Sequence, residues 1–417
     1  MTVTSALTDF RYWKWRVLIA FCVFYAFNYL GRFNFSLVQP AVMDDLGMTA
    51  AQTGFINSWM FWGFAFGDLV HGRLGERYGY RVIVLLGALG TAAFNVAASY
   101  GDTVLGIALP WGVVGFLNAA TWAPAIGLLA QWWGRRERGR ALGLVMFAAG
   151  VALLLVWVAT PWVAAEWGWR AALRYPPLAI AVLGILFYFA ARDRPSDVGL
   201  DDYEEHDEVS RDAEAATERS HTVGLAAYWH LMTNWRFFVA CQVKGLDNVV
   251  RYGIVSWAPV YYAKVGGLDL KSMALATFAY PLGYLFAPLV GGFISDRIFH
   301  GNRSTVIAIS SLLSAISVMG MAIAPADSIP VAVVLLAVVG FTANLSPMAA
   351  LAVDLAGRQL AGTASGVFDA HGYVYGALQA TFFGWIVITF DQGWLMVFSA
   401  MAFTRIIGLL AILRVRA

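Results

Sequence analysis

Two arginines lie inside long apolar stretches of the sequence, where a charged side chain is costly. Arg32 falls in the apolar run 16–38, and Arg251 falls in the run 234–262. A charged residue within a membrane-spanning helix usually faces a water-filled pathway or a buried partner. Guanidinium groups present fork-shaped donors that match phosphate or carboxylate oxygens, and they stay charged at physiological pH. The pair therefore predicts a binding site for a small organic anion.

Polar side chains accompany both arginines at helical spacing. Those around Arg32 share one helical face, which suits a water-filled cavity better than lipid; they are Tyr25, Asn28, Tyr29, Ser36 and Gln39. Lys244, Asp247 and Arg251 share another face, and a local ion pair of Asp247 would still leave one positive charge. We predict this substrate-binding set: Asn28, Tyr29, Arg32, Lys244, Asp247, Arg251, Tyr252 and Trp257.

Further ionisable residues lie within apolar stretches. Asp68, Asp369 and His371 are candidates for coupling or selectivity, and each could instead make a buried bond between helices. Asp369 and His371 lie about 200° apart around a helix, so they cannot both point straight into one cavity. We expect Arg405 to be structural or interfacial.

The composition indicates an integral membrane protein. Of 417 residues, 60% are hydrophobic and 13% are charged, whereas soluble domains are about 45–50% apolar and about 25% charged. A net charge of +2 disfavours nucleic-acid binding, and two cysteines disfavour a disulfide framework or a cysteine metal site. No lysine follows a glycine and no HExxH motif occurs, so we expect neither a P-loop nor a zincin site, no cofactor and no enzyme activity.

Apolar runs of about 20 residues predict twelve membrane-spanning helices. They lie near 16–38, 52–71, 82–100, 104–130, 141–163, 172–191, 234–262, 272–295, 304–324, 328–353, 363–388 and 394–413. We expect an N-terminal six-helix bundle (1–191), an acidic connector (192–225) that acts as a tether, and a C-terminal six-helix bundle (226–417). The arginines gather in the even-numbered loops, which places both termini in the cytoplasm.

The two halves resemble each other in sequence. Gly72–Arg77 recurs as Gly292–Arg297 at an offset of 220, and Arg32 matches Arg251 at 219. Such an offset indicates a duplicated six-helix unit, and transporters built this way bind substrate at the interface of the repeats. The acidic–arginine pairs at the helix ends are expected to act as a conformational gate without touching the ligand; they are Glu76–Arg77 and Asp296–Arg297.

Several segments together resemble the major facilitator superfamily, and within it the organophosphate:phosphate antiporters. These are NYLGRFNFSLVQP (28–40), QWWGRRERG (131–139), RDRPSDVGL (192–200), RYGIVSWAP (251–259), GGFISDRIFHGNR (291–303) and AGTASG (361–366). The resemblance implies an all-α carrier of twelve helices in two pseudo-symmetric bundles, in which Arg32 and Arg251 grip the phosphate group. This chain departs from the family at Ala149, Asp68 and Ser256, which makes a carboxylate-bearing or zwitterionic substrate an alternative.

We expect a monomeric transporter in the inner membrane of a bacterium, embedded in the lipid bilayer. It would carry a small organic anion by alternating access, either in exchange for another anion or together with protons. The alternative is a transporter-like membrane sensor that binds an organic anion without net transport.

Overall fold

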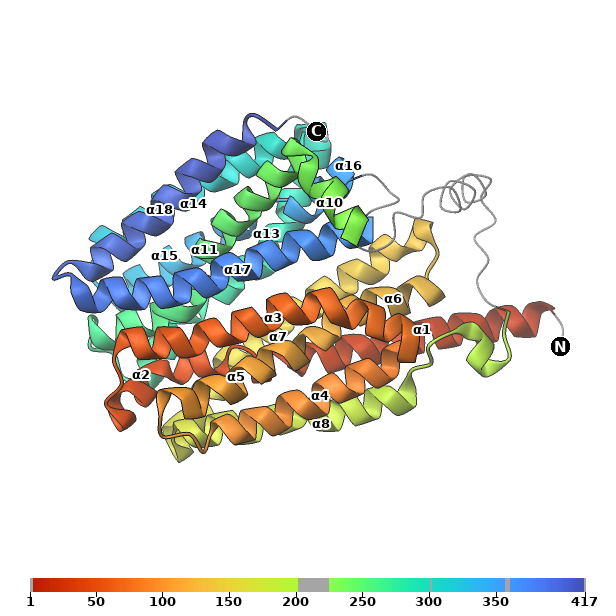
Figure 1. The fold of residues 1–417 in the computed structure, drawn as a ribbon, viewed down its shortest axis with the longest axis horizontal. Helices are drawn as coiled ribbons and strands as arrows, with labels where there is room; N and C mark the ends of the chain where they lie inside the picture. Colours follow the sequence, from red (N-terminus) through yellow and green to blue (C-terminus); the bar gives the residue numbers. More distant parts are fainter. Residues whose placement is uncertain (1–2, 202–224, 301, 357–360, 416–417) are drawn as a thin grey trace.

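The computed structural model describes residues 3–201, 225–300, 302–356 and 361–415. Within these ranges the secondary structure is helical and forms two bundles (Figure 1). The N-terminal half contains α1 (Val3–Asn28), η1 (Tyr29–Gly31), α2 (Asn34–Leu46), α3 (Ala50–Tyr78), α4 (Tyr80–Ala98), α5 (Val104–Asn118), η2 (Ala119–Thr121), α6 (Trp122–Trp132), α7 (Arg135–Trp167) and α8 (Trp169–Ala190).

The C-terminal half repeats this arrangement. It contains α10 (Leu225–Thr233), α11 (Trp235–Lys264), α12 (Leu270–Thr277), α13 (Ala279–Phe293), the π-helical turn η4 (Ile294–Ile298), α14 (Arg303–Ile323), α15 (Ile329–Asn344), α16 (Met348–Ala356), α17 (Ala361–Thr389) and α18 (Gly393–Ile412). Broken rods such as α1–α2, α5–α6 and α12–α13 correspond to single predicted spans. The predicted fold of twelve helices in two bundles is therefore confirmed.

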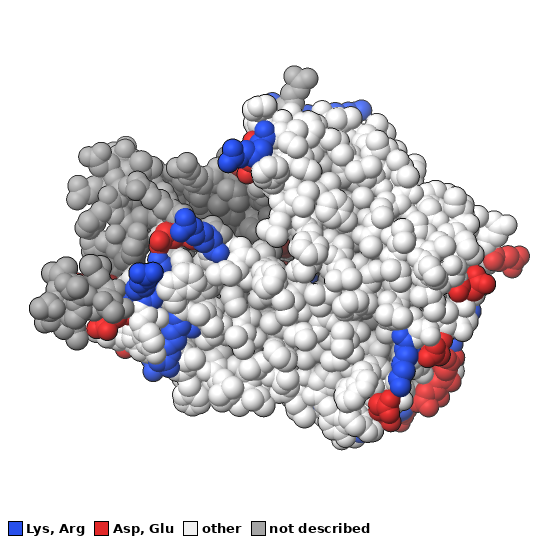
Figure 2. All heavy atoms as spheres, turned by 180° about the vertical axis from the view of Figure 1, so that it is seen from behind, with Lys and Arg blue, Asp and Glu red and all other residues white. Residues whose placement is uncertain are grey.

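The outer surface of the bundles suits a bilayer. Eight helical stretches among the described residues are long and apolar enough to cross a membrane. Figure 2 shows a broad uncharged band, with Lys, Arg, Asp and Glu gathered mainly at the two ends of the molecule. The long helices α3, α11 and α17 fall outside that set of eight, and they carry Asp68, Lys244, Arg251 and Asp369. Polar residues thus concentrate on the helices between the halves.

Glycine contacts reveal the duplication in three dimensions. In the N-terminal half, Gly115 on α5 packs on the backbone of Met60 on α3. In the C-terminal half, Gly340 on α15 packs in the same way on the backbone of Tyr280 on α13. The positions differ by 225 and 220, close to the offset of the sequence repeat. A side chain at either glycine would hold the helices apart, so the same small-residue contact sets the helix packing in both halves.

The two halves are joined at the face opposite the chain termini, which we name the distal face. Lys264 there forms an ion pair with Asp44, and Lys271 Nζ lies 2.9 Å from Glu166 Oε1. At the terminal face the ion pairs of the described residues stay within one half; they are Lys14–Glu137, Arg81–Asp193, Arg303–Asp296 and Arg303–Asp354. Figure 1 shows α3 and α17 close together at the distal face and diverging toward the termini.

Replacement of Gly54 by valine is expected to open the distal face. A Cβ atom at Gly54 on α3 would clash with the carbonyl oxygen of Ala380 on α17, which belongs to the other half. We predict that a cysteine at the buried position Asn57 reacts about tenfold faster with an impermeant maleimide from the distal side. Gly143→Val is the matched control, because nothing lies within 4 Å of a Cβ atom there. Equal labelling rates in the two variants would contradict the expected opening.

The connector begins as an ordered segment on the N-terminal half. The backbone N–H of Arg81 donates to Asp193 Oδ1 at 2.9 Å, and the indole of Trp132 donates to the carbonyl of Arg192 at 2.9 Å. The short helix η3 (Pro195–Val198) follows. Arg81 and Trp132 thus hold the first residues of the connector on the N-terminal half, and the role of 192–225 as a tether stays a prediction. Residues 202–224 lie outside the described structure.

Candidate functional site

The first membrane-spanning helix is interrupted next to Arg32. Helix α1 ends at Asn28, η1 follows, and α2 starts at Asn34. Gly31 allows close packing beside the break, since a Cβ atom there would come 2.7 Å from Thr91 Cγ2. Asn95 Nδ2 donates to the free carbonyl of Gly31 at 3.1 Å and thereby replaces a lost helical bond. The break means that the predicted stripe around Arg32 does not follow one continuous helix.

Arg32 reaches from the N-terminal half to tyrosines of the C-terminal half. Its Nη2 atom donates to Tyr373 Oη at 2.9 Å and to Tyr252 Oη at 3.3 Å. The guanidinium lies 4.2 Å from the centroid of the Phe64 ring. The residue is only 6% exposed, and its Nε atom has no hydrogen-bond partner. Arg32 is thus buried between the halves, with donor capacity to spare.

Arg251 lies in a cavity walled by tyrosines of both halves. Its Nη2 atom donates to Tyr284 Oη at 2.7 Å, and its backbone carbonyl accepts from Tyr280 Oη at 3.2 Å. The cavity is small, with a volume of about 10 Å³, and its lining includes Tyr29 and Tyr252. Tyr252 accepts from Arg32 and also lies 5.7 Å from the Arg251 guanidinium. A single tyrosine side chain therefore separates the two cations.

Asp247 neutralises a cation other than those expected. It is buried on α11 and forms an ion pair with Arg405 on α18. Arg405 is 1% exposed and also donates to Ser310 Oγ at 3.2 Å. The helical spacing had suggested Lys244 or Arg251 as the local partner. Because Arg405 takes the carboxylate, no carboxylate of the described residues lies within ion-pair distance of Arg251, and Asp247 points into the C-terminal bundle.

Breaking this buried pair is expected to destabilise the protein. Asp247→Ala leaves the Arg405 charge buried without a counter-ion, which costs about 3–5 kcal/mol. Thermal melting of purified protein in detergent measures the loss. The double variant Asp247→Leu with Arg405→Met should recover most of the stability, because an apolar pair replaces the ionic one. A single variant as stable as the parent protein would show that the pair is not needed.

Asp68 and Asp369 lie at matching levels of two helices that belong to opposite halves. Helices α3 and α17 run antiparallel: Gly54 packs at Ala380, and the rings of Phe64 and Tyr373 stack 4.9 Å apart. One helical turn further toward the terminal face, this register places Asp68 opposite Asp369.

Lys244 on α11 pairs with one of these two acids. Its Nζ atom lies 3.7 Å from Asp369 Oδ1, and its side chain is 12% exposed. The predicted set around the arginines therefore falls into two neighbouring groups. One is the tyrosine-lined pair of guanidiniums, and the other is the group Asp68, Asp369 and Lys244.

Other predicted residues lie away from these two groups. Asn28 exchanges hydrogen bonds with Asn118 inside the N-terminal half, at 2.9 and 3.3 Å. The Nδ1 atom of His371 lies 2.8 Å from the carbonyl of Val367 on its own helix. Trp257 is fully buried against Gly54 and Gly384 near the distal face. Asn28 and Trp257 thus stabilise the bundles where they lie, and a ligand contact by them stays a prediction.

The four predicted gate residues lie at the terminal face. Asp296 pairs with Arg303, whose Nε atom also lies 3.4 Å from Asp354 Oδ2. Arg297 follows Asp296 in η4, while Glu76 and Arg77 line a polar hollow in the last turn of α3, beside Asp193. These contacts stay within one half, so a gating role for the four residues stays a prediction.

Five tyrosines surround the two arginines, and we name them the tyrosine cage: Tyr29, Tyr252, Tyr280, Tyr284 and Tyr373. The sequence predicted only Tyr29 and Tyr252 among them. Tyr373, Tyr280 and Tyr284 contact the arginines from α17 and α13, yet none was in the predicted binding set. Tyr373 follows Asp369 by one helical turn, and this spacing was the available signal. Tyr280 and Tyr284 lie on a helix that carries no charged residue between Ala279 and Phe293, so nothing in the sequence marked it as part of the site.

Two pseudo-symmetric bundles that hold paired cations at their interface define a membrane carrier of the alternating-access type. The model of the Major Facilitator Superfamily matches residues 21–380 and 250–416. The chain belongs to this superfamily.

Individual relatives match most of the chain or nearly all of it. It is 26% identical over 420 residues to a probable hexose phosphate transport protein of Chlamydia pneumoniae, covering 97% of this chain and 91% of that protein. It is 28% identical over 312 residues to the membrane sensor protein UhpC of Salmonella typhimurium, covering 73% and 70%. Its fold matches a bacterial homologue of the human lysosomal transporter Spinster, with a TM-score of 0.75, 14% identity and coverage of 96% and 95%.

Proposed function

We propose that this protein is a secondary transporter of a small organic anion of the organophosphate class. The observation that carries the proposal is the placement of Arg32, which is buried, and Arg251, which is half-buried, among the same tyrosines between the halves. Their described hydrogen-bond partners are hydroxyl groups. A phosphate oxygen is a stronger acceptor than a neutral hydroxyl, so an anion can replace these contacts. The name of the relative from Chlamydia pneumoniae supports a sugar phosphate as the first substrate to test.

Transport would proceed by alternating opening of the two faces. We assign the terminal face to the cytoplasm, because arginines concentrate in the loops on that side. The described conformation is then closed at the outer face by Lys264–Asp44 and Lys271–Glu166. An anion that links Arg32 and Arg251 would draw the two halves together at the terminal face. The proposed setting is the inner membrane of a bacterium, with one chain as the transporting unit.

For coupling, we propose that the carboxylates of Asp68 and Asp369 share a proton as the terminal face closes. Closing moves α3 toward α17 at the level of these two residues, and two ionised carboxylates repel. Lys244 pairs with Asp369, and Tyr373, one helical turn from Asp369 on α17, accepts a hydrogen bond from Arg32. His371 is the weaker candidate, because its Nδ1 atom is engaged by the carbonyl of Val367.

Counterflow in proteoliposomes tests the proposed function. Vesicles loaded with unlabelled hexose phosphate should accumulate the labelled compound, with saturation and with inhibition by other organophosphates. In a second arm, a pH gradient is imposed without internal anion. Uptake in that arm supports proton symport, whereas uptake only with internal anion indicates obligatory exchange. Absence of saturable counterflow for sugar phosphates, glycerol phosphates, phosphonates and hydroxy acids would refute transport of this class.

A sensor is the second candidate, favoured by the similarity to UhpC. A sensor would bind the same anion at Arg32 and Arg251 without carrying it across. Ligand-dependent thermal stabilisation combined with an absence of counterflow would favour this alternative. Stabilisation together with counterflow would dismiss it.

A further inference from the structure

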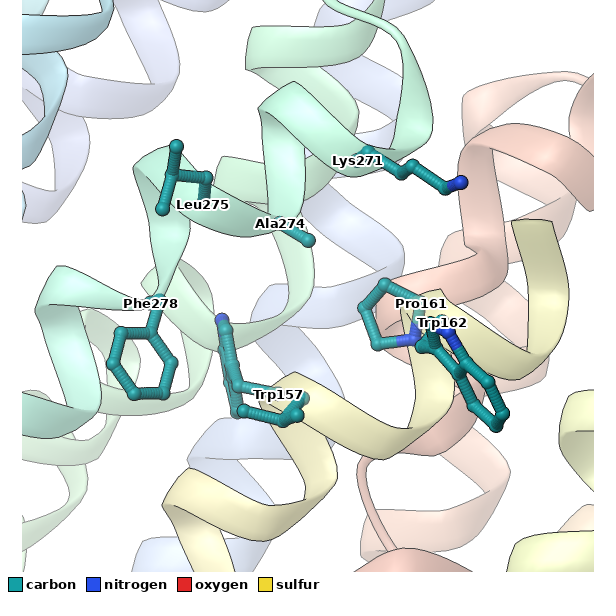
Figure 3. Close-up of a pocket in the computed structure, with 8 residues that line it drawn as sticks. Trp157, Pro161, Trp162, Lys271, Ala274, Leu275 and Phe278 are labelled. Atoms are coloured by element: carbon teal, nitrogen blue, oxygen red, sulfur yellow. The ribbon is translucent and has the colours of Figure 1, made fainter. Parts of the chain in front are cut away.

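A lateral crevice lies between the two halves near the distal face, away from the tyrosine cage around Arg32 and Arg251. Figure 3 shows its walls, which come from α7 on one side and from α12 and its C-terminal end on the other. Trp157, Pro161 and Trp162 lie across a hollow of about 320 Å³ from Ala274, Leu275 and Lys271. Seven of the eight lining residues have uncharged side chains, and Lys271 is the charged exception.

The crevice opens sideways, toward the lipid. Leu275 is 64% exposed and Trp162 is 56% exposed, and both lie at the mouth of the crevice. Its inner wall is Trp157, which is 2% exposed and donates from Nε1 to Thr277 Oγ1 at 3.2 Å across the two halves. In a chain that spans a bilayer, an apolar hollow of this kind faces hydrocarbon. Filling it with an acyl chain restores the dispersion contacts that an unfilled wall forgoes.

The outer end of the crevice carries groups suited to a lipid headgroup. Lys271 is 61% exposed and pairs with Glu166 at 2.9 Å. An ammonium group has three donors, so this ion pair leaves capacity for a phosphate oxygen. Trp162, Trp167 and Tyr175 form a chain of edge-to-face rings nearby, with centroid distances of 5.4 and 6.4 Å. Exposed tryptophan and tyrosine gather where hydrocarbon meets headgroups, so Lys271 lies at headgroup level.

We propose that this crevice binds one phospholipid with an anionic headgroup. An acyl chain packs between Trp157 on α7 and Ala274 on α12, and the headgroup contacts Lys271. Because α7 and α12 belong to different halves, the lipid contacts both sides of the closed distal face. Opening of that face separates the walls and removes the site, so the lipid favours the described conformation.

Photo-cross-linking in vesicles tests the site without relying on transport. The protein is reconstituted with phosphatidylglycerol that carries a diazirine in its acyl chain, or with the matching phosphatidylcholine, and adducts are mapped by mass spectrometry. Trp157 is the reporter, because its burial shields it from bulk lipid. We expect adducts on Trp157 in phosphatidylglycerol, and an about tenfold loss when Ala274→Phe fills the crevice. Ala93→Phe, on an exposed face of α4, is the control and should change nothing.

Two further variants separate the parts of the proposal. Leu275→Trp narrows the mouth at an exposed position and should lower the Trp157 adducts even if Ala274→Phe fails to fold. Lys271→Gln should reduce the preference for phosphatidylglycerol over phosphatidylcholine to less than about twofold. Absence of Trp157 adducts, or adducts that persist in Leu275→Trp, would overturn the acyl-chain site. Equal labelling by both lipids in the parent protein would overturn the anionic headgroup.

Discussion

Replacement of Arg32 by lysine is expected to lower sugar-phosphate counterflow about 30- to 150-fold, the effect of losing one charge-assisted hydrogen bond of about 2–3 kcal/mol. Lysine keeps the positive charge but loses the fork of donors that can bind two phosphate oxygens at once. Arg251→Lys should show a loss of similar size, because the two residues occupy equivalent places in the repeat. The measurement is the initial rate of counterflow in proteoliposomes with matched protein content.

Arg16→Lys serves as the control for this pair of variants. Arg16 is half-buried in α1 and donates to Tyr12 Oη at 3.3 Å, away from the arginine pair, so its replacement should leave counterflow unchanged. Thermal melting must show that all three variants are folded. Counterflow rates like those of the parent protein in both Arg32→Lys and Arg251→Lys would remove these residues from the substrate site.

Replacement of Asp68 by asparagine is expected to separate proton coupling from anion movement. The variant keeps the shape of the side chain but removes one of the two carboxylates that lie at the same level where α3 packs beside α17. Closure of the terminal face then no longer requires a shared proton. We predict that uptake driven by a pH gradient falls at least about tenfold, while counterflow changes less than about threefold. Asp369→Asn should act in the same direction, although it also frees Lys244.

The control for this prediction is His371→Gln, which removes a titratable group whose Nδ1 atom is engaged by its own helix. It should keep gradient-driven uptake. If the parent protein shows no gradient-driven uptake, or if Asp68→Asn keeps it, the proposed proton role is wrong. A variant that fails to insert in the membrane would show instead that Asp68 supports folding.

Much of the fold follows from the sequence because bilayer thickness sets a strong length constraint. The apolar runs predicted the twelve membrane-spanning helices, and the offset between Arg32 and Arg251 predicted the duplicated six-helix unit. The break at Gly31 was not predictable, since it depends on Asn95 of α4, which donates a hydrogen bond to the carbonyl of Gly31. The docking of Asp193 on Arg81 was missed for the same reason. Both depend on tertiary partners that local composition does not reveal.

The site was predictable where charge marked it and missed where aromatic residues formed it. Arginine in an apolar run is rare and costly, so Arg32 and Arg251 stood out. Tyrosine is common in membrane helices, so Tyr284 and Tyr373 did not. The partner of Asp247 was also hidden, because helical spacing offers only neighbours on the same helix, whereas Arg405 lies on α18. The opposition of Asp68 and Asp369 became visible only with the antiparallel register of α3 and α17.

A double-mutant cycle on ligand binding tests most directly whether Arg32 and Arg251 hold one anion together. The dissociation constant for hexose phosphate is measured by isothermal titration calorimetry for the parent protein, Arg32→Gln, Arg251→Gln and the double variant. If both guanidiniums grip the same phosphate, each single variant loses most of the affinity, and the double variant loses little more. The expected coupling energy is at least about 1 kcal/mol. Additive losses, or single variants that bind like the parent protein, would contradict a shared anion.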